Sequence, residues 1–130
     1  MEEVYNFLKK CGIFYIATID GDKPRVRPFG VVNIYEKKLY IQTGKIKNVS
    51  KQIQTNPNIE ICGYIDNKWL RVEAKAIRDD RREAKKSMLD ANPTLRSMYD
   101  EDDANTEVLY LENAKGTFYS FTEEPREVNF

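Results

Sequence analysis

IFYIATIDGDKPRVRPFGVVNIY, residues 13–35, is the stretch of sequence that decides the fold. In its first part, 13–19, β-branched and aromatic side chains occur on both faces of the expected strand. This predicts a strand that is buried on both faces. The Asp-Gly-Asp sequence at 20–22 has the residue types of a tight turn, so a β-hairpin is expected there. Residues 25–35 then predict a second, long strand.

Two residues interrupt that second strand. Pro28 has no N–H to donate to a sheet ladder, and Gly30 has no side chain to pack, so a bulge or kink is predicted between them. Just before it, Arg25 and Arg27 are two residues apart and therefore leave the same face of the strand. Two guanidinium groups on one face repel each other unless an anion lies near them. This irregular strand is the first place to look for a function.

The rest of the chain alternates short strands with a few helices. Further strands are predicted at 39–42, 59–65, 69–77, 107–112 and 116–122, and helices at 2–10, 46–54, 80–89 and from 93 to about 99. Asp80 and Glu83 form a capping-box pattern at the start of the third helix. A polar tail ends at Phe130. Six or seven strands with hairpin connections predict a mainly β protein, a six- to seven-stranded antiparallel barrel with flanking α-helices.

Length and composition narrow the class of protein. A chain of 130 residues predicts a single domain over 1–130. Lys and Arg total 21 and Asp and Glu total 21, so the overall basic field of a nucleic-acid-binding protein is absent and no nucleic acid is expected as a partner. No apolar run approaches the roughly 20 residues that cross a bilayer, and the N-terminus is unlike a signal peptide. We therefore expect no membrane association and a cytoplasmic location.

The chain has no histidine and two cysteines that are far apart in sequence. Histidine is the commonest general base and a frequent zinc ligand, so its absence argues against a catalytic triad and against most zinc sites. No metal site is predicted and no catalytic side chain can be assigned. Any chemistry must come from other groups or from a cofactor.

Charge is unevenly distributed along the neutral chain. Between residues 23 and 55 there are eight Lys and Arg residues and one acidic residue, Glu36, whereas residues 100–130 contain nine acidic residues and two basic ones. The excess of positive charge in residues 23–55 therefore favours the binding of an anion. Lys37 and Lys38 have a simpler interpretation, because exposed sheet edges are commonly rich in lysine.

TGKIKN, residues 43–48, links a strand end to a helix start. The first N–H groups of a helix and the positive end of its dipole favour a phosphate. Thr43, Lys47, Asn48 and Lys51 add a hydroxyl, two ammonium groups and an amide to that position. The stretch matches neither of the two common Gly-rich phosphate loops. A phosphate site is predicted here nonetheless.

Three segments carry a resemblance to a known family: ATIDGDKPRVRPFGVV (17–32), LYIQTGKIKNVSKQIQTNPNIEI (39–61) and KWLRVEAKA (68–76). In this order they resemble the pyridoxamine 5′-phosphate oxidase-like family of FMN-binding split barrels, and most closely its short bacterial NimC/NimA-type members, which are labelled nitroimidazole-resistance proteins. The resemblance implies an antiparallel split β-barrel that binds FMN. It also implies a homodimer with two FMN molecules at the subunit interface.

The resemblance also assigns cofactor-binding roles by position. One strand segment would run along the flavin, the end of the next strand would contact the ribityl chain or phosphate, the following helix start would bind phosphate, and an aromatic side chain would cover the flavin from the partner subunit. The family's usual helix lysine aligns with Val49 here. The cofactor-binding residues implied are Arg25, Val26, Arg27, Pro28, Gln42, Thr43, Lys47, Asn48, Lys51 and Trp69. For Trp69 and the neighbouring aromatic residues of 118–121, simple core packing is the alternative interpretation.

The function that the resemblance implies is an FMN-dependent oxidoreductase acting on a small molecule, such as a nitro compound or a quinone, with NAD(P)H as electron donor. The missing histidine and the short chain depart from the nitroimidazole reductases and from a true pyridoxamine phosphate oxidase. Two alternatives stay open. The first is a non-catalytic protein that binds flavin or another cofactor, such as a deazaflavin or haem. The second is a β-barrel interaction module without a cofactor.

Overall fold

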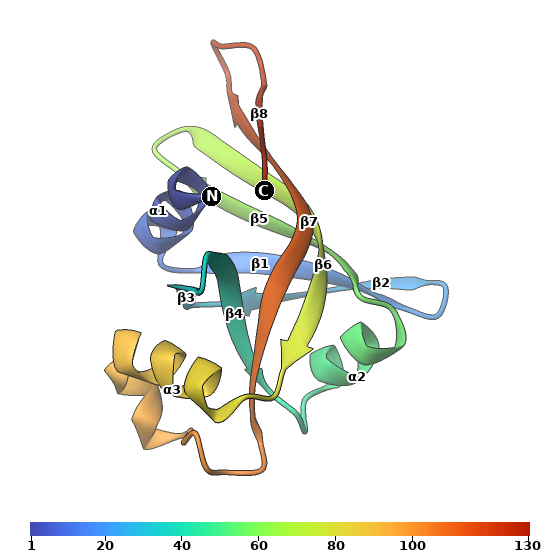
Figure 1. Ribbon diagram of the computed structural model, residues 1–130. Helices are drawn as coiled ribbons and strands as arrows, with labels where there is room; N and C mark the ends of the chain where they lie inside the picture. The colour runs from blue at the N-terminus through green and yellow to red at the C-terminus, as the bar shows by residue number, and fades with distance from the viewer.

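The computed structural model describes all residues, 1–130. It contains one eight-stranded antiparallel sheet, three α-helices and a short 3₁₀ helix (Figure 1). In chain order these are α1 (Glu2–Cys11), β1 (Phe14–Asp20), β2 (Lys23–Phe29), β3 (Val32–Tyr35), β4 (Lys38–Gly44), α2 (Asn48–Thr55), β5 (Asn58–Ile65), β6 (Lys68–Asp79), α3 (Arg82–Ala91), η1 (Pro93–Ser97), β7 (Thr106–Ser120) and β8 (Arg126–Asn129). No helix is both long enough and apolar enough to cross a membrane.

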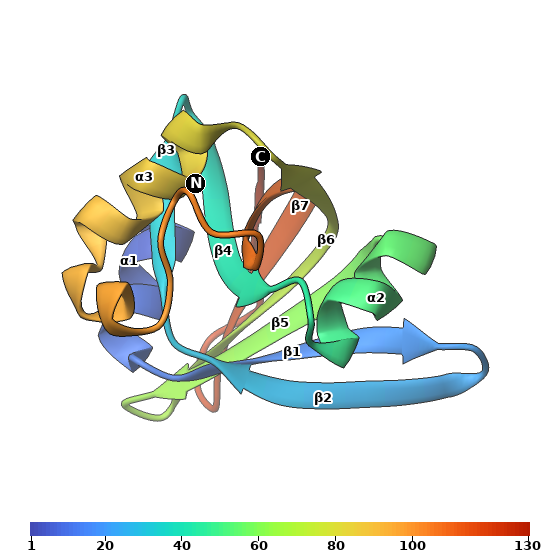
Figure 2. The ribbon, with the colours of Figure 1, turned by 90° about the horizontal axis from the view of Figure 1, so that it is seen from below.

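The sheet curls into a split barrel. Its strand order is β2-β1-β5-β6-β7-β4-β3, with β8 paired to β7. Strands β2 and β3 stand at opposite ends of this order but follow each other in sequence, so Gly30 and Val31 connect the two edges of the curled sheet (Figure 2). A cluster of 19 buried apolar side chains, including Phe14, Ile41 and Leu109, fills the interior. The predicted mainly β, antiparallel architecture is confirmed, with eight strands in place of six or seven.

The predicted irregularity lies where Pro28 and Gly30 place it. The segment 25–35 is divided into two strands, because β2 ends at Phe29 and β3 begins at Val32. The predicted kink is therefore confirmed, whereas the single long strand is wrong. The hairpin before it is also confirmed: Asp20 pairs with Lys23, and Gly21 has a φ of 64°, which glycine adopts without strain.

The C-terminal region differs from the prediction. Residues 106–120 form one strand, β7, instead of two, because a register shift against β6 and a positive φ of 52° at Asn113 absorb the expected turn as a bulge. The predicted polar tail contains β8, which pairs with β7 over four residue pairs. Phe130 extends this pairing, since its N–H and C=O both bond to Ala114.

Strand β1 is buried on one face only within a single chain. Phe14 and Ile16 are fully buried, but Tyr15 is 51% exposed and Ile19 is 39% exposed. The prediction of burial on both faces is therefore wrong for the chain alone, because nothing in the chain covers the outer face of β1. Val26 of β2, opposite Ala17 of β1, continues this exposed apolar surface.

Two helix starts also differ from the prediction. α2 begins at Asn48, so Ile46 lies outside it and is exposed, whereas Val49 and Ile53 are buried as predicted. α3 begins after Arg81, whose side chain makes no capping hydrogen bond. The predicted capping box is wrong because Asp80 instead pairs with Lys45 Nζ at 2.9 Å.

Candidate functional site

A groove of about 660 Å³ lies between β2 and α2, where the helix covers one end of the β1–β2 hairpin (Figure 2). Four cationic side chains line it and Asp20 is the one carboxylate among its lining residues. We call it the cationic groove; its lining residues are Asp20, Arg25, Val26, Arg27, Lys47, Asn48, Val49, Lys51 and Gln52. The excess of positive charge makes the groove suited to an anion.

Arg27 is the best-anchored cation of the groove. Its Nη1 donates hydrogen bonds to Thr18 Oγ1 at 2.8 Å and to the carbonyl oxygen of Ile16 at 3.2 Å, and its Nη2 donates to Gln52 Oε1 at 2.6 Å. Burial, followed by the positive charge of Arg25, lowers the pKa of Arg27. A lowered pKa means that the charged form is under-compensated, so an anion bound beside it would stabilise it.

Arg25 lies on the same face of β2 as Arg27, as the alternation predicted. Its Nε donates to Asp20 Oδ2 at 3.0 Å, in a pair in which both side chains are about half exposed. An exposed ion pair of this kind contributes little stability and exchanges readily with other anions. Arg25 is therefore available to a ligand at the mouth of the groove.

The start of α2 forms the opposite wall. Lys47 is the N-cap residue in extended conformation, no side chain caps the helix, and its first turn has no acidic residue. The preceding loop is held by Asn105, which accepts the N–H of Ile46 on its side-chain oxygen at 3.1 Å. Gly44 is needed for this contact, because an added Cβ would lie 2.8 Å from the Asn105 amide nitrogen. The free helix start is thus held facing the two arginines.

A second depression, of about 210 Å³, adjoins the cationic groove and shares Arg27, Lys47 and Val49 with it. Its lining residues are Arg27, Pro28, Phe29, Gly30, Val31, Gln42, Thr43, Lys47, Val49, Leu95, Met98 and Tyr99. Away from the shared end, no charged side chain lines this second depression. The two together offer a cationic end and a neutral, mostly apolar end.

Gln42 is the unusual residue of the second depression. It is only 7% exposed, and both its Oε1 and its Nε2 are buried without a hydrogen-bond partner. Leaving such a group unpaired costs on the order of 1–3 kcal/mol, so buried amides normally have partners. An amide that lines a depression and lacks both kinds of partner points to a ligand with donor and acceptor groups.

Nine of the ten predicted cofactor-binding residues line these two depressions. They are Arg25, Val26, Arg27, Pro28, Gln42, Thr43, Lys47, Asn48 and Lys51. Trp69 lies apart from them, at the start of β6, where its ring stacks on Tyr119 with centroids 5.4 Å apart and lies 5.2 Å from that of Phe121. Within one chain, the structure does not bring Trp69 to the predicted site.

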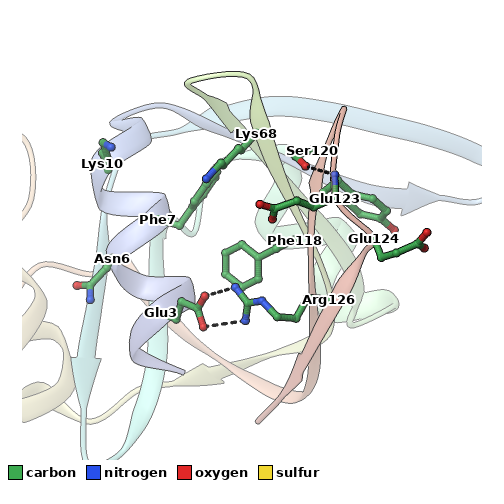
Figure 3. Close-up of a pocket in the computed structure, with 11 residues that line it drawn as sticks. Glu3, Asn6, Phe7, Lys10, Lys68, Phe118, Ser120, Glu123, Glu124 and Arg126 are labelled. Atoms are coloured by element: carbon green, nitrogen blue, oxygen red, sulfur yellow. Dashed lines mark hydrogen bonds and ion pairs between the residues drawn. The ribbon is translucent and has the colours of Figure 1, made fainter.

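Another depression, of about 300 Å³, lies between α1, the end of β7 and β8 (Figure 3). Its apolar floor is formed by Phe7 and Phe118, whose rings meet edge to face, and Glu3 and Arg126 form an ion pair across it. None of the ten predicted residues lines it. Its charged groups are of both signs, so it has no clear preference for an anion.

Sequence reasoning missed several residues of the site. Gln52 accepts a hydrogen bond from Arg27, but only the packing of α2 on β1 brings it there, and no local motif signals this. Leu95, Met98 and Tyr99 reach the second depression from η1 and the loop after it. Their apolar character was visible in the sequence, but their position depends on long-range folding.

The curled sheet and the segment that connects its edges define a split β-barrel, and the charge of its cationic groove is suited to an anion. The sequence profile of the family described as pyridoxamine 5′-phosphate oxidase matches residues 1–119. The chain therefore belongs to the pyridoxamine 5′-phosphate oxidase family, whose fold is a flavin-binding one. Within it, the chain is similar to a NimC/NimA family protein from Clostridium acetobutylicum, with 44% identity and a TM-score of 0.97 over 100% of this chain and 92% of that one.

More distant structures share the fold. General Stress Protein 26 from Bacillus anthracis has 18% identity and a TM-score of 0.74, covering 98% of this chain and 97% of its own. HutZ, the haem storage protein from Vibrio cholerae, has 15% identity and a TM-score of 0.66, covering 85% of this chain and 87% of its own. A comparison with curated proteins found no match.

Proposed function

We propose that the chain binds FMN across the cationic groove and the second depression, and uses it as an oxidoreductase that transfers electrons from NAD(P)H to a small molecule such as a nitro compound or quinone. The observation that carries this proposal is the unpartnered, buried amide of Gln42 in a neutral depression that continues directly into a groove with four cations. A ligand with a planar polar ring at one end and a phosphate at the other fits that arrangement.

The cationic groove supplies the phosphate end of the proposed site. Arg27 is fixed by its three hydrogen bonds, and Lys47 stands at the uncapped start of α2. Each charge-assisted hydrogen bond to a phosphate contributes about 1.5–3 kcal/mol net. Three or four of them account for a large part of the roughly 8 kcal/mol that micromolar affinity requires.

The second depression supplies the ring end. The Gln42 amide can donate one hydrogen bond and accept another, and the polar edge of an isoalloxazine ring offers both kinds of partner. Pro28, Gly30 and Val31 line one side of this depression. The residues present therefore fit FMN at both ends.

FMN, when bound, supplies two-electron chemistry: NAD(P)H gives up a hydride and becomes NAD(P)⁺, and that hydride with one further proton converts a quinone to a hydroquinone. The protein's own contribution is positional and electrostatic. Arg27 and Lys47 line both depressions, so their positive charge lies where the phosphate end meets the ring end and can also stabilise the negative charge that the ring gains on reduction. No histidine is needed for this role.

We also propose that two copies of the chain associate through the outer face of the sheet. This surface has five exposed apolar side chains of β1, β2, β5 and the turn before β1, namely Ile13, Tyr15, Ile19, Val26 and Tyr64. An apolar sheet face of this kind is usually covered by a partner. A second copy would also offer the Trp69 aromatic cluster to the neighbouring site.

A non-catalytic role is the second candidate, in which the chain sequesters flavin or another cofactor, such as a deazaflavin or haem. What favours it is the scarcity of proton donors and acceptors: Asp20, which is paired with Arg25, and Tyr99 are the acidic groups lining the two depressions. The fold that the chain shares with the haem storage protein HutZ is compatible with this candidate.

One experiment separates these possibilities. The purified chain is mixed with FMN, passed through gel filtration and examined by visible absorbance, then titrated anaerobically with NADH and NADPH. Retained flavin bands that bleach with a nicotinamide and return on adding a quinone are the expected result. Retained flavin that no nicotinamide reduces supports the non-catalytic candidate. Failure to retain FMN, with a Soret band on adding haem, overturns the flavin proposal.

A further inference from the structure

The neutral end of the site has a wall that comes from a distant part of the chain. Leu95, Met98 and Tyr99, on η1 and the loop that follows it, line the second depression together with Gln42. Met98 is 71% exposed, so a large apolar side chain borders the depression without being buried by the chain itself. Exposure of a methionine beside a ligand-sized depression favours contact with a ligand over a role in the core.

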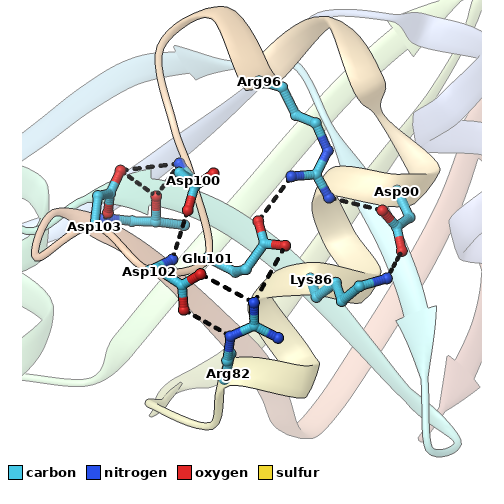
Figure 4. A network of polar contacts seen from close by, with 9 residues as sticks. Arg82, Lys86, Asp90, Arg96, Asp100, Glu101, Asp102 and Asp103 are labelled. Carbon is cyan, nitrogen blue, oxygen red and sulfur yellow. Dashed lines mark hydrogen bonds and ion pairs between the residues drawn. The ribbon is translucent and has the colours of Figure 1, made fainter.

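This wall carries no free charge. Arg96 lies between Leu95 and Met98 in sequence, but Figure 4 shows its guanidinium directed towards two carboxylates. Its Nη2 is 2.7 Å from Asp90 Oδ1 and its Nη1 is 2.7 Å from Glu101 Oε2. The single cation of η1 is thus held on the side of α3 and neutralised there.

A network of polar contacts holds the wall in place (Figure 4). Arg82 of α3 binds Asp102 through two hydrogen bonds, from Nε at 2.6 Å and from Nη2 at 2.9 Å. Asp103 accepts the N–H groups of Asp100 and Asn105, which fixes the loop before β7. The wall is therefore preformed, and a preformed site loses little entropy when a ligand binds.

We propose that Leu95, Met98 and Tyr99 select the electron acceptor, and that the acceptor they admit is a flat, uncharged aromatic molecule. This inference rests on the proposed FMN-dependent function. Methionine sulfur and tyrosine rings both make favourable contacts with aromatic faces. An anionic acceptor gains nothing from this wall, because Arg27 and Lys47, the cations of the depression, lie at the end assigned to the cofactor phosphate.

The test introduces a cation into the wall. Met98→Lys is compared with Met98→Leu, which keeps an apolar side chain, and with Thr94→Lys, which places the same charge on an exposed part of η1 outside both depressions. Without any nicotinamide, each FMN-loaded protein is titrated with nitrobenzene and with 4-nitrobenzoate, and the dissociation constants are taken from the change in flavin absorbance. KM and kcat for both compounds are then measured with NADPH or NADH.

The wild-type chain is expected to bind nitrobenzene more tightly than 4-nitrobenzoate. Met98→Lys should weaken nitrobenzene binding by about tenfold and reverse that preference, mainly through KM. Met98→Leu should keep the wild-type preference for nitrobenzene, and Thr94→Lys should stay close to wild type. Equal effects of Met98→Lys and Thr94→Lys, or a wild-type preference for 4-nitrobenzoate, would overturn this inference alone. Failure of the wild-type chain to retain FMN would overturn the proposed function and this inference with it.

Discussion

The Nη2 of Arg27 donates a hydrogen bond to Oε1 of Gln52 at 2.6 Å, and this contact joins the projecting β1–β2 hairpin to α2. The same Gln52 oxygen accepts a hydrogen bond from Thr18 Oγ1 at 2.5 Å. One amide oxygen thus connects three elements, and the two walls of the cationic groove are held at a fixed separation. Because Arg27 both supports the groove and presents its charge there, tests of the site must separate these two roles.

Replacing Arg27 is expected to weaken FMN binding. Arg27→Ala should raise the dissociation constant for FMN roughly 10- to 100-fold, because it removes at least one charge-assisted hydrogen bond to phosphate. Fluorescence titration with FMN measures the effect, and the reduction potential of any retained flavin should become more negative. Arg71→Ala on β6, which removes an ion pair with Glu60 of β5, is the matched control. Affinity and potential that match the control would remove Arg27 from the site.

The two lysines of the groove provide a test by salt dependence. Lys47→Ala combined with Lys51→Ala should weaken FMN binding steeply at low ionic strength and should flatten the dependence of affinity on salt. Lys37→Ala combined with Lys75→Ala removes two exposed lysines outside both depressions and should leave affinity within about twofold. If the first pair shows no loss, the phosphate site lies elsewhere.

We expect the protein to lose stability in acid as the carboxylate of Asp79 becomes protonated. Hydrogen bonds from Arg81, and then from Tyr40, lower the pKa of this carboxyl group from 3.8 to about 2. Because the folded-state pKa lies below the unfolded one, the carboxylate stabilises the fold fully above about pH 4, and this stabilisation, about 2 kcal/mol, is lost as pH falls through about 2. Urea unfolding of wild type and Asp79→Asn should therefore differ most above about pH 4. A difference that does not vary with pH would contradict this assignment.

The outer face of the sheet predicts association of two chains. Tyr15→Glu places a charge in the centre of the exposed apolar surface, opposite Cys62 of β5, and should convert a dimer to a monomer. Sedimentation velocity measures the mass, and the unfolding free energy checks that the variant is folded. Met98→Glu, at a more exposed apolar position on the loop after η1, should leave the mass unchanged. A wild-type chain that sediments as a monomer would remove the proposed interface.

Local patterns in the sequence predicted the parts of the site that local structure determines. Alternation along one strand placed Arg25 and Arg27 on a common face, and Pro28 with Gly30 predicted the break that lets the sheet edges join. The helix after the TGKIKN segment was also predicted, from the apolar face that Val49 and Ile53 form, although it begins at Asn48 and not at residue 46.

The remaining parts depend on contacts between distant segments. The unpaired amide of Gln42 and the Met98 wall follow from how η1 and its loop pack against the barrel, and no local motif encodes that packing. β8 was missed for the same reason, because its strand character comes from pairing with β7. The apolar pattern of β1 correctly indicated a strand, but the predicted burial on both faces is wrong for the single chain, which covers only one of them.

The central claim is that the cationic groove and the second depression together bind FMN, and a calorimetric titration with FMN, riboflavin and inorganic phosphate tests it most directly. We predict micromolar or tighter binding of FMN, at least tenfold weaker binding of riboflavin, and a further loss for FMN in Gln42→Ala, because the ligand needs both the cations and the buried amide. Equal affinities for FMN and riboflavin, or full affinity in Gln42→Ala, would contradict the account.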